Sequence, residues 1–151
     1  MADITNKRKP ATAGGFSEEE RGAMKQRALE LKAEARSISD RASGEAAVNA
    51  AINALPEPDR TIARKINEIV TAEAPRLMPR TWYGFPAYAK DGKIICFYQP
   101  AAKFKTRYGT FGFQQDAKLD DGNIWPVAFA VKELTTADEA KLAELVKKAT
   151  R

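Results

Sequence analysis

The stretch that decides the fold is FPAYAKDGKIICFYQ, residues 85–99. Its two halves, 85–89 and 93–99, are short runs rich in aromatic and β-branched residues, and the tripeptide Lys90-Asp91-Gly92 lies between them. Asp-Gly readily adopts the positive backbone angles of a tight turn between antiparallel strands. The stretch therefore predicts a β-hairpin, from which the rest of the chain can be interpreted in both directions.

The amino-acid composition around the hairpin indicates more strands. Twelve of the thirteen aromatic residues lie between Trp82 and Phe129, in short runs interrupted by Gly, Pro and Asp. Residues 105–113 and 124–131 are two further candidate strands, and an acidic loop, 114–123, connects them. We expect a mostly antiparallel sheet of about four strands.

Helical spacing marks the segments on both sides of this region. Residues 17–36 begin with Ser17 and Glu20 at capping-box spacing but carry only a thin apolar stripe. Residues 44–55 and 59–74 follow, and the latter has the best amphipathic stripe, so we expect it to be the main helix against the sheet. In the last segment, Thr136 and Glu139 again have capping-box spacing.

These elements predict an α+β fold with an extra N-terminal helix. We divide the 151 residues into a disordered leader (1–15), an N-terminal helical extension (16–42) and a single α+β domain (43–151). A chain of this length can bury a core without disulfides or metals.

Composition excludes several classes of function. Histidine is absent, which removes imidazole as a general base and as a metal ligand. Cys96 is the single cysteine, so no intramolecular disulfide can form; this favours a reducing compartment, and we expect a cytoplasmic protein. No stretch is apolar enough for a signal peptide or a membrane span, so we expect no membrane partner.

The net charge of +5 comes from 25 basic and 20 acidic residues. Both signs are spread evenly along the chain, whereas nucleic-acid binding surfaces concentrate Lys and Arg in one patch or stripe. We therefore do not expect a nucleic-acid partner.

A family resemblance lies in the run Thr81-Trp82-Tyr83-Gly84-Phe85-Pro86-Ala87-Tyr88, with Asp91-Gly92-Lys93 and Lys105-Thr106-Arg107-Tyr108 after it. This pattern resembles the YdhG/YdeI-like family of bacterial domains of unknown function, over about residues 45–150. The resemblance implies a frataxin-like α+β fold, a two-layer sandwich with helices on one face of the sheet, and some members have been described as iron chaperones. This chain departs from the family pattern at Arg107, where relatives often have His, and in its N-terminal helix.

The candidate site combines aromatic rings with basic side chains. Lys103, Lys105 and Arg107 alternate along the start of the predicted third strand, which would place them on one face beside the rings. Such a face suits an anionic or flat aromatic ligand through ion pairing and cation–π stacking. The predicted ligand-binding residues are Trp82, Tyr83, Pro86, Tyr88, Tyr98, Lys103, Lys105 and Arg107.

Other interpretations remain open for the same residues. The aromatic face could be a ligand groove, a dimer interface or a partly covered core, and the basic residues could protect an edge strand from aggregation. Cys96, between Ile95 and Phe97, is expected to be a buried hydrophobic residue rather than a nucleophile.

Three functional hypotheses follow. We favour a non-enzymatic module that binds a small molecule or a protein, with a homodimer among the possible assemblies and with no cofactor. The alternative is a frataxin-like metal handler that holds iron through Asp116, Asp120 and Asp121 as weak oxygen ligands. The third is an enzyme that works without histidine, for which no catalytic residues can be named.

Overall fold

The computed structural model describes residues 17–39 and 41–151, and it has the predicted α+β architecture. The described residues form one antiparallel sheet whose five strands lie side by side in sequence order. The strands are β1 (Met78–Trp82), β2 (Phe85–Lys90), β3 (Lys93–Gln99), β4 (Gly109–Phe113) and β5 (Ala128–Val131). The predicted leader, residues 1–15, lies outside the described residues.

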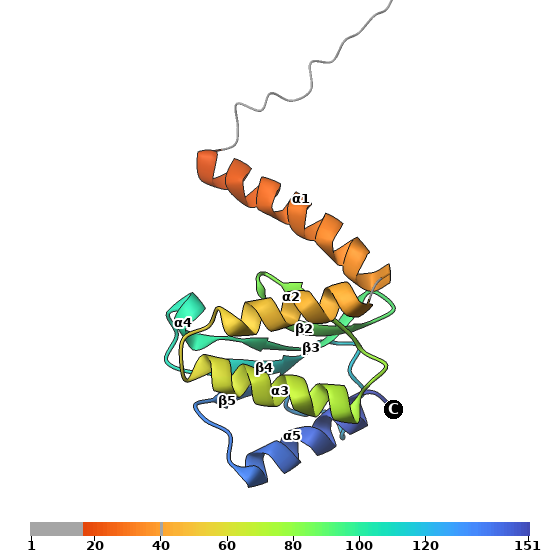
Figure 1. Ribbon diagram of the computed structural model, residues 1–151. Coiled ribbons are helices and arrows are strands. Elements are labelled where there is room, and N and C mark those ends of the chain that lie inside the picture. Colours follow the sequence, from red (N-terminus) through yellow and green to blue (C-terminus); the bar gives the residue numbers. More distant parts are fainter. Residues whose placement is uncertain (1–16, 40) are drawn as a thin grey trace, which may run out of the picture.

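The helices among the described residues are α1 (Glu18–Ser39), α2 (Arg41–Asn53), α3 (Asp59–Glu73), α4 (Ala101–Phe104) and α5 (Thr136–Ala149). Three of them form the second layer (Figure 1). α2, α3 and α5 cover one face of the sheet, and their apolar side chains share one core with those of the strands. Within the described ranges, no helix combines the length and apolar character that a membrane span needs.

The predicted hairpin is confirmed. β2 and β3 pair in antiparallel register with Lys90 opposite Lys93, and Asp91 and Gly92 have φ of 51° and 78° in the turn. A register shift between Tyr88 and Ala89 interrupts the ladder, so the side-chain alternation of β2 changes at that point.

The sheet has one strand more than the roughly four expected, because β1 was not predicted. β1 contains Pro79, which has no backbone N–H. A strand with a neighbour on each side needs all of its N–H groups for hydrogen bonds, so proline is confined to edge strands. Pro79 is tolerated because β1 is an edge strand that pairs only with β2. The sheet therefore begins at Met78 rather than near Trp82.

The two downstream strands are shorter than predicted. Residues 101–104 form α4, and Lys105 ends that helix with a left-handed φ of 54°, so the predicted strand 105–113 begins only at Gly109. The predicted strand 124–131 begins at Ala128, since Ile124 lies in a loop with 88% of its surface exposed.

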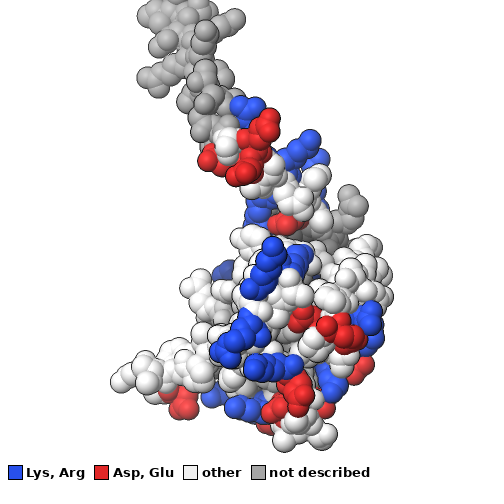
Figure 2. Space-filling model, turned by 90° about the vertical axis from the view of Figure 1, so that its left-hand side faces the viewer, with Lys and Arg blue, Asp and Glu red and all other residues white. Residues whose placement is uncertain are grey.

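The N-terminal helix stands away from the rest of the molecule over much of its length (Figure 2). Ser17 Oγ accepts a hydrogen bond from Glu20 N, which confirms the predicted cap. The polar break expected at 37–43 is reduced to the junction between α1 and α2, because α1 extends to Ser39 and α2 begins at Arg41. The boundary drawn at residue 42 therefore falls inside α2.

Candidate ligand-binding site

The site is organised by Asp59, the first residue of α3. Although Glu57 Oε2 accepts a hydrogen bond from the Thr61 amide in the first turn of α3 at 3.3 Å, Asp59 makes no hydrogen bond to an amide of this helix. The carboxylate instead accepts hydrogen bonds from Tyr98 Oη at 3.0 Å and from the amides of Ala101 and Ala102 at 3.2 and 3.0 Å. Only 3% of Asp59 is exposed, so these three donors fix the start of α4 from beneath.

Around α4 lies a group of exposed cations that we call the basic corner: Lys103, Lys105, Arg107 and Lys132. They do not alternate along a strand as predicted. Lys103 lies on α4, Lys105 ends that helix and Arg107 follows in the turn to β4. Lys132, just after β5, joins them from a distant part of the sequence and lines a hollow together with Arg107.

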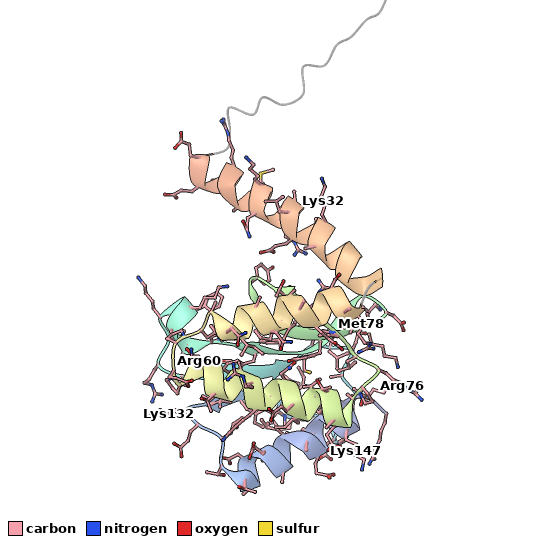
Figure 3. All side chains as sticks on the ribbon, in the orientation of Figure 1. Lys32, Arg60, Arg76, Met78, Lys132 and Lys147 are labelled. Carbon is pink, nitrogen blue, oxygen red and sulfur yellow. The ribbon has the colours of Figure 1, made fainter. Side chains whose placement is uncertain are left out.

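Lys and Arg side chains gather in a column on the side of the molecule where α4 lies (Figure 2). Within residues 17–39 and 41–151, no member of the basic corner forms an ion pair with a carboxylate. In Figure 3, Lys132 lies on the left and Lys147 on the right of the lower part of the molecule. The corner is therefore a local concentration of positive charge without ion pairs, which the even distribution along the sequence concealed. The carboxylates of Glu57 and Asp59 line the same hollow as Arg107 and Lys132.

Two hollows flank α4, and Ala102 lines both. One, of about 370 Å³, lies between the start of α3, the turn before β4 and the end of β5; Arg107, Tyr108 and Lys132 are among its walls. The other, of about 390 Å³, lies between the end of α2 and the β1–β2 turn, with Lys103 at its border. Each hollow thus has a basic side chain at its edge and apolar groups beside it.

An aromatic cluster occupies the sheet face opposite the main core, as the surplus of rings suggested. It consists of Trp82, Tyr83, Phe85, Phe97 and Phe104, and the ring centroids of its contacting pairs are 5.1–6.3 Å apart. The Phe97 ring also lies over Gly112, where a Cβ would approach it to 2.5 Å. Trp82 and Phe97 are half-buried, whereas Tyr83 and Phe104 are 52% and 40% exposed.

The aromatic cluster meets the basic corner at the β1–β2 turn. A Cβ added to Gly84 would overlap Lys103 Nζ, so the ammonium group lies directly on this turn. The guanidinium of Arg27, from α1, lies 5.9 Å from the centroid of the Tyr83 ring. On the other side of α4, the guanidinium of Arg107 lies 5.1 Å from the centroid of the Tyr108 ring.

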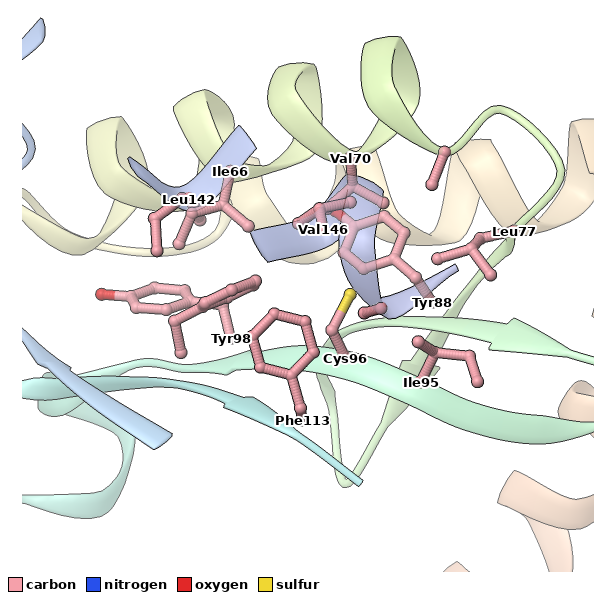
Figure 4. Packing of buried hydrophobic residues seen from close by; sticks show 14 of the residues in the cluster. Ile66, Val70, Leu77, Tyr88, Ile95, Cys96, Tyr98, Phe113, Leu142 and Val146 are labelled. Atoms are coloured by element: carbon pink, nitrogen blue, oxygen red, sulfur yellow. The ribbon is translucent and has the colours of Figure 1, made fainter. Parts of the chain in front are cut away.

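Three predicted site residues belong to the core instead. Pro86, Tyr88 and Tyr98 are almost completely buried. They are on the helix-covered face, and Figure 4 shows both tyrosines packed beneath the helices. Tyr88 Oη donates to Asn67 Oδ1 at 2.7 Å, and burial raises the pKa of both phenols. The hydroxyl groups of both tyrosines form internal hydrogen bonds, and Pro86 is buried. The three residues are therefore not part of the ligand site.

Sequence reasoning missed Asp59, Phe104 and Lys132 as parts of the site. Phe104 lay in a segment assigned to no element, and the signal that could have found it is Pro100, which often precedes a helix. Lys132 and Asp59 carry no local signal, because only the tertiary fold brings β5 and the start of α3 to α4.

The acidic residues proposed for iron do not form a centre. Asp116 Oδ1 lies 3.9 Å from Lys93 Nζ, and in the described part of the chain no three His, Cys, Asp or Glu side chains are grouped as metal ligands. Cys96 is fully buried, as expected, and burial raises its pKa far above the usual thiol range. A thiol in this state is not a nucleophile.

No family model matches the chain, and neither a curated protein nor a solved structure matches it. The resemblance to the YdhG/YdeI-like family therefore remains an expectation based on its sequence motifs.

Proposed function

We propose that this chain is a non-enzymatic binding module that takes a small organic anion with a planar ring at the basic corner. The observation that carries the proposal is that four exposed cations and three exposed aromatic rings meet around α4. Among the described residues, none of the four cations forms an ion pair with a carboxylate. The rings are Tyr83, Phe104 and Tyr108.

The chemistry of these groups defines the ligand. A carboxylate, sulfonate or phosphate would form charge-assisted hydrogen bonds with Lys or Arg, and Arg107 can bind such a group with two parallel N–H donors. A planar ring would stack on the exposed aromatic side chains or beneath a cation. Hollows of about 370 and 390 Å³ fall within the size range of small-molecule sites.

Backbone geometry positions two of these groups. Tyr83 and Gly84, with φ of 50° and 81°, form the two-residue turn between the paired residues Trp82 and Phe85. Lys105, with φ of 54°, is the left-handed residue that ends α4. The β1–β2 turn and the end of α4 therefore present Tyr83 and Lys105 at the border of the proposed site.

The test is a titration of the isotope-labelled full chain with naphthalene-1-sulfonate and, separately, with inorganic phosphate. Binding is measured from the changes in the amide chemical shifts. We expect shifts at residues 101–109 with the sulfonate and weaker ones with phosphate. Lys105→Gln combined with Arg107→Gln should weaken sulfonate binding about tenfold, because it removes two charge-assisted contacts.

The matched control is Lys147→Gln, which removes an exposed charge in the last turn of α5, across the molecule from Lys132 in Figure 3, and should leave the affinity unchanged. If the double variant and the control bind the sulfonate equally well, or if neither probe shifts the amides around α4 at about 10 mM, the proposed site is wrong.

A further inference from the structure

β5 is an edge strand with an unused row of backbone groups. It pairs with β4 through Phe111 opposite Phe129 and Gly109 opposite Val131, and Phe113 N donates to Val127 O at 2.7 Å just beyond the strand. Antiparallel residues alternate between bonding to the partner strand and pointing away from it. The N–H and C=O groups of Ala128 and Ala130 therefore point outward, and the described chain gives them no hydrogen-bond partner.

Although β5 is short, with four residues, its exposed residues Ala128 and Ala130 carry no charge or proline, and no register shift interrupts its pairing with β4. Natural edge strands carry inward-pointing charges, proline or bulges to prevent pairing with other chains. The sequence of β5 is Ala-Phe-Ala-Val, with both alanines exposed. Pro126 and Lys132 flank the strand but leave Ala128 and Ala130 open.

A groove runs along this edge between β5 and α5. It has a volume of about 170 Å³, and its walls come from both elements and from the segment that joins them: Phe129, Ala130, Val131, Glu133, Leu134, Asp138, Lys141 and Leu142. The first turns of α5 lie beyond β5, on the side away from β4 (Figure 1). The helix layer thus extends over the position that a sixth strand would take.

The groove has room for one apolar side chain and is bordered by charged residues. Phe129 lies on the helix-covered face because it pairs with the buried Phe111, and Leu134 and Leu142 are buried beside it. Lys141 Nζ lies 5.5 Å from the centroid of the Phe129 ring. A strand residue opposite Phe129 would direct its side chain under α5, whereas its two neighbours would face away from the helices.

A second copy of this chain fits the edge poorly. Two β5 strands related by a twofold axis would bring both α5 helices over that axis, because each helix projects past its own strand. The two helices would then meet across the axis, on the same face of the joined sheet. A single extended segment without a helix layer of its own avoids this contact.

We propose that β5 accepts an extended peptide as a sixth strand, which bonds to the backbone of Ala128 and Ala130 and places one apolar side chain in the groove beneath α5. Main-chain hydrogen bonds supply affinity in this mode of recognition, and the pocket for the alternate side chain supplies specificity. The surface is distinct from the basic corner and does not depend on the proposed function.

The probe is a capped peptide of sequence Thr-Thr-Leu-Thr-Thr added to the isotope-labelled full chain at up to about 10 mM. We expect progressive shifts at the amides of Ala128 and Ala130 and at the Leu142 methyl groups. A peptide in which Asp replaces Leu should bind at least about tenfold more weakly, because its charge would enter the apolar groove. A peptide N-methylated on the residues that face β5 should produce no shifts at Ala128 and Ala130.

Ala130→Pro provides the protein-side test. Its N–H points away from β4, so the substitution removes an outward donor without breaking a bond of the sheet, and an unchanged circular dichroism spectrum would verify the fold. Loss of peptide binding supports the proposal. Absence of shifts with the parent peptide, or equal shifts with the N-methylated one, overturns it, as would a dimer in sedimentation equilibrium that Ala130→Pro dissociates.

Discussion

Gly44 lies where α2 approaches β1, and at this residue two effects of opposite sign compete. Replacing Gly by Ala inside a helix normally stabilises it by about 1 kcal/mol. A Cβ at this position, however, would overlap the backbone carbonyl oxygen of Pro79, which no side-chain rotation can relieve. We expect Gly44→Ala to lower the free energy of unfolding by about 1–3 kcal/mol, measured by urea denaturation, because the overlap outweighs the helix propensity.

Gly22 is the matched control, since it is also inside a helix but a Cβ there would meet nothing within 4 Å. Gly22→Ala should leave the unfolding free energy unchanged or raised and should increase helical circular dichroism. Equal stabilisation by both substitutions would show that α2 does not approach β1 as closely as described.

Residue by residue, the sequence indicated the chemistry of the site better than its location. Tyr88 and Tyr98 carry the same aromatic and hydroxyl groups as Tyr83, so composition could not separate them. What separates them is the sheet face, because Tyr88 and Tyr98 face the helices whereas Trp82, Phe85 and Phe97 face the other way. Alternation predicts two faces, but only the packed structure shows which face the helices cover.

At the scale of elements, the start of α5 allows a test of which of two adjacent threonines caps the helix. We expected a capping box at Thr136 and Glu139, but the structure places it one residue earlier. Thr135 Oγ1 accepts from Asp138 N at 3.2 Å, and Asp138 Oδ2 accepts from Thr135 N at 2.9 Å. Both spacings fit the motif, and the structure uses the pair Thr135 and Asp138.

We predict that Thr135→Ala lowers the free energy of unfolding by about 1 kcal/mol, because it removes the cap of α5. Thr136→Ala, at the first helical position, should change it by less than about 0.5 kcal/mol. Urea denaturation of the two variants compares them directly. The reverse order would restore the register expected from the sequence.

Elements with a regular period were predictable, and those that depend on their neighbours were not. The hairpin, α3 and the alternating strand β3 carry their own signals in turn residues and apolar spacing. β1 contains a proline that only an edge position tolerates, and α4 is a single turn whose two first amides are satisfied by Asp59 from another helix. Neither dependence is visible in a local window of sequence.

At the scale of the whole molecule, the buried thiol and phenol groups of the core should make the free energy of unfolding decrease at alkaline pH. Burial raises the pKa of the Cys96 thiol and of the Tyr88 and Tyr98 phenols above their ordinary values. The folded state keeps these protons at a pH where the unfolded chain begins to release them. The stabilisation is therefore fully present below the unfolded pKa values and is lost as the pH rises above them.

Cys96 should be the first of these groups to act, because the ordinary pKa of a thiol, 9.0, is below the 10.0 of a phenol. Between about pH 8 and 10, an unfolded thiol with that pKa loses its proton while the buried one does not, which favours unfolding by about 1 kcal/mol. We expect the free energy of unfolding to fall over this range, with the phenols extending the decline above about pH 10.

The measurement is urea denaturation at several pH values under reducing conditions, for the parent chain and for Cys96→Ala. The variant should be less stable at neutral pH because it leaves a small cavity, but its stability should fall less steeply, by about 1 kcal/mol over the same range. Comparing slopes rather than absolute stabilities separates thiol titration from the cavity. Parallel pH dependences in the two proteins would mean that Cys96 is accessible to solvent, and the packing of β3 beneath the helices would then have to be revised.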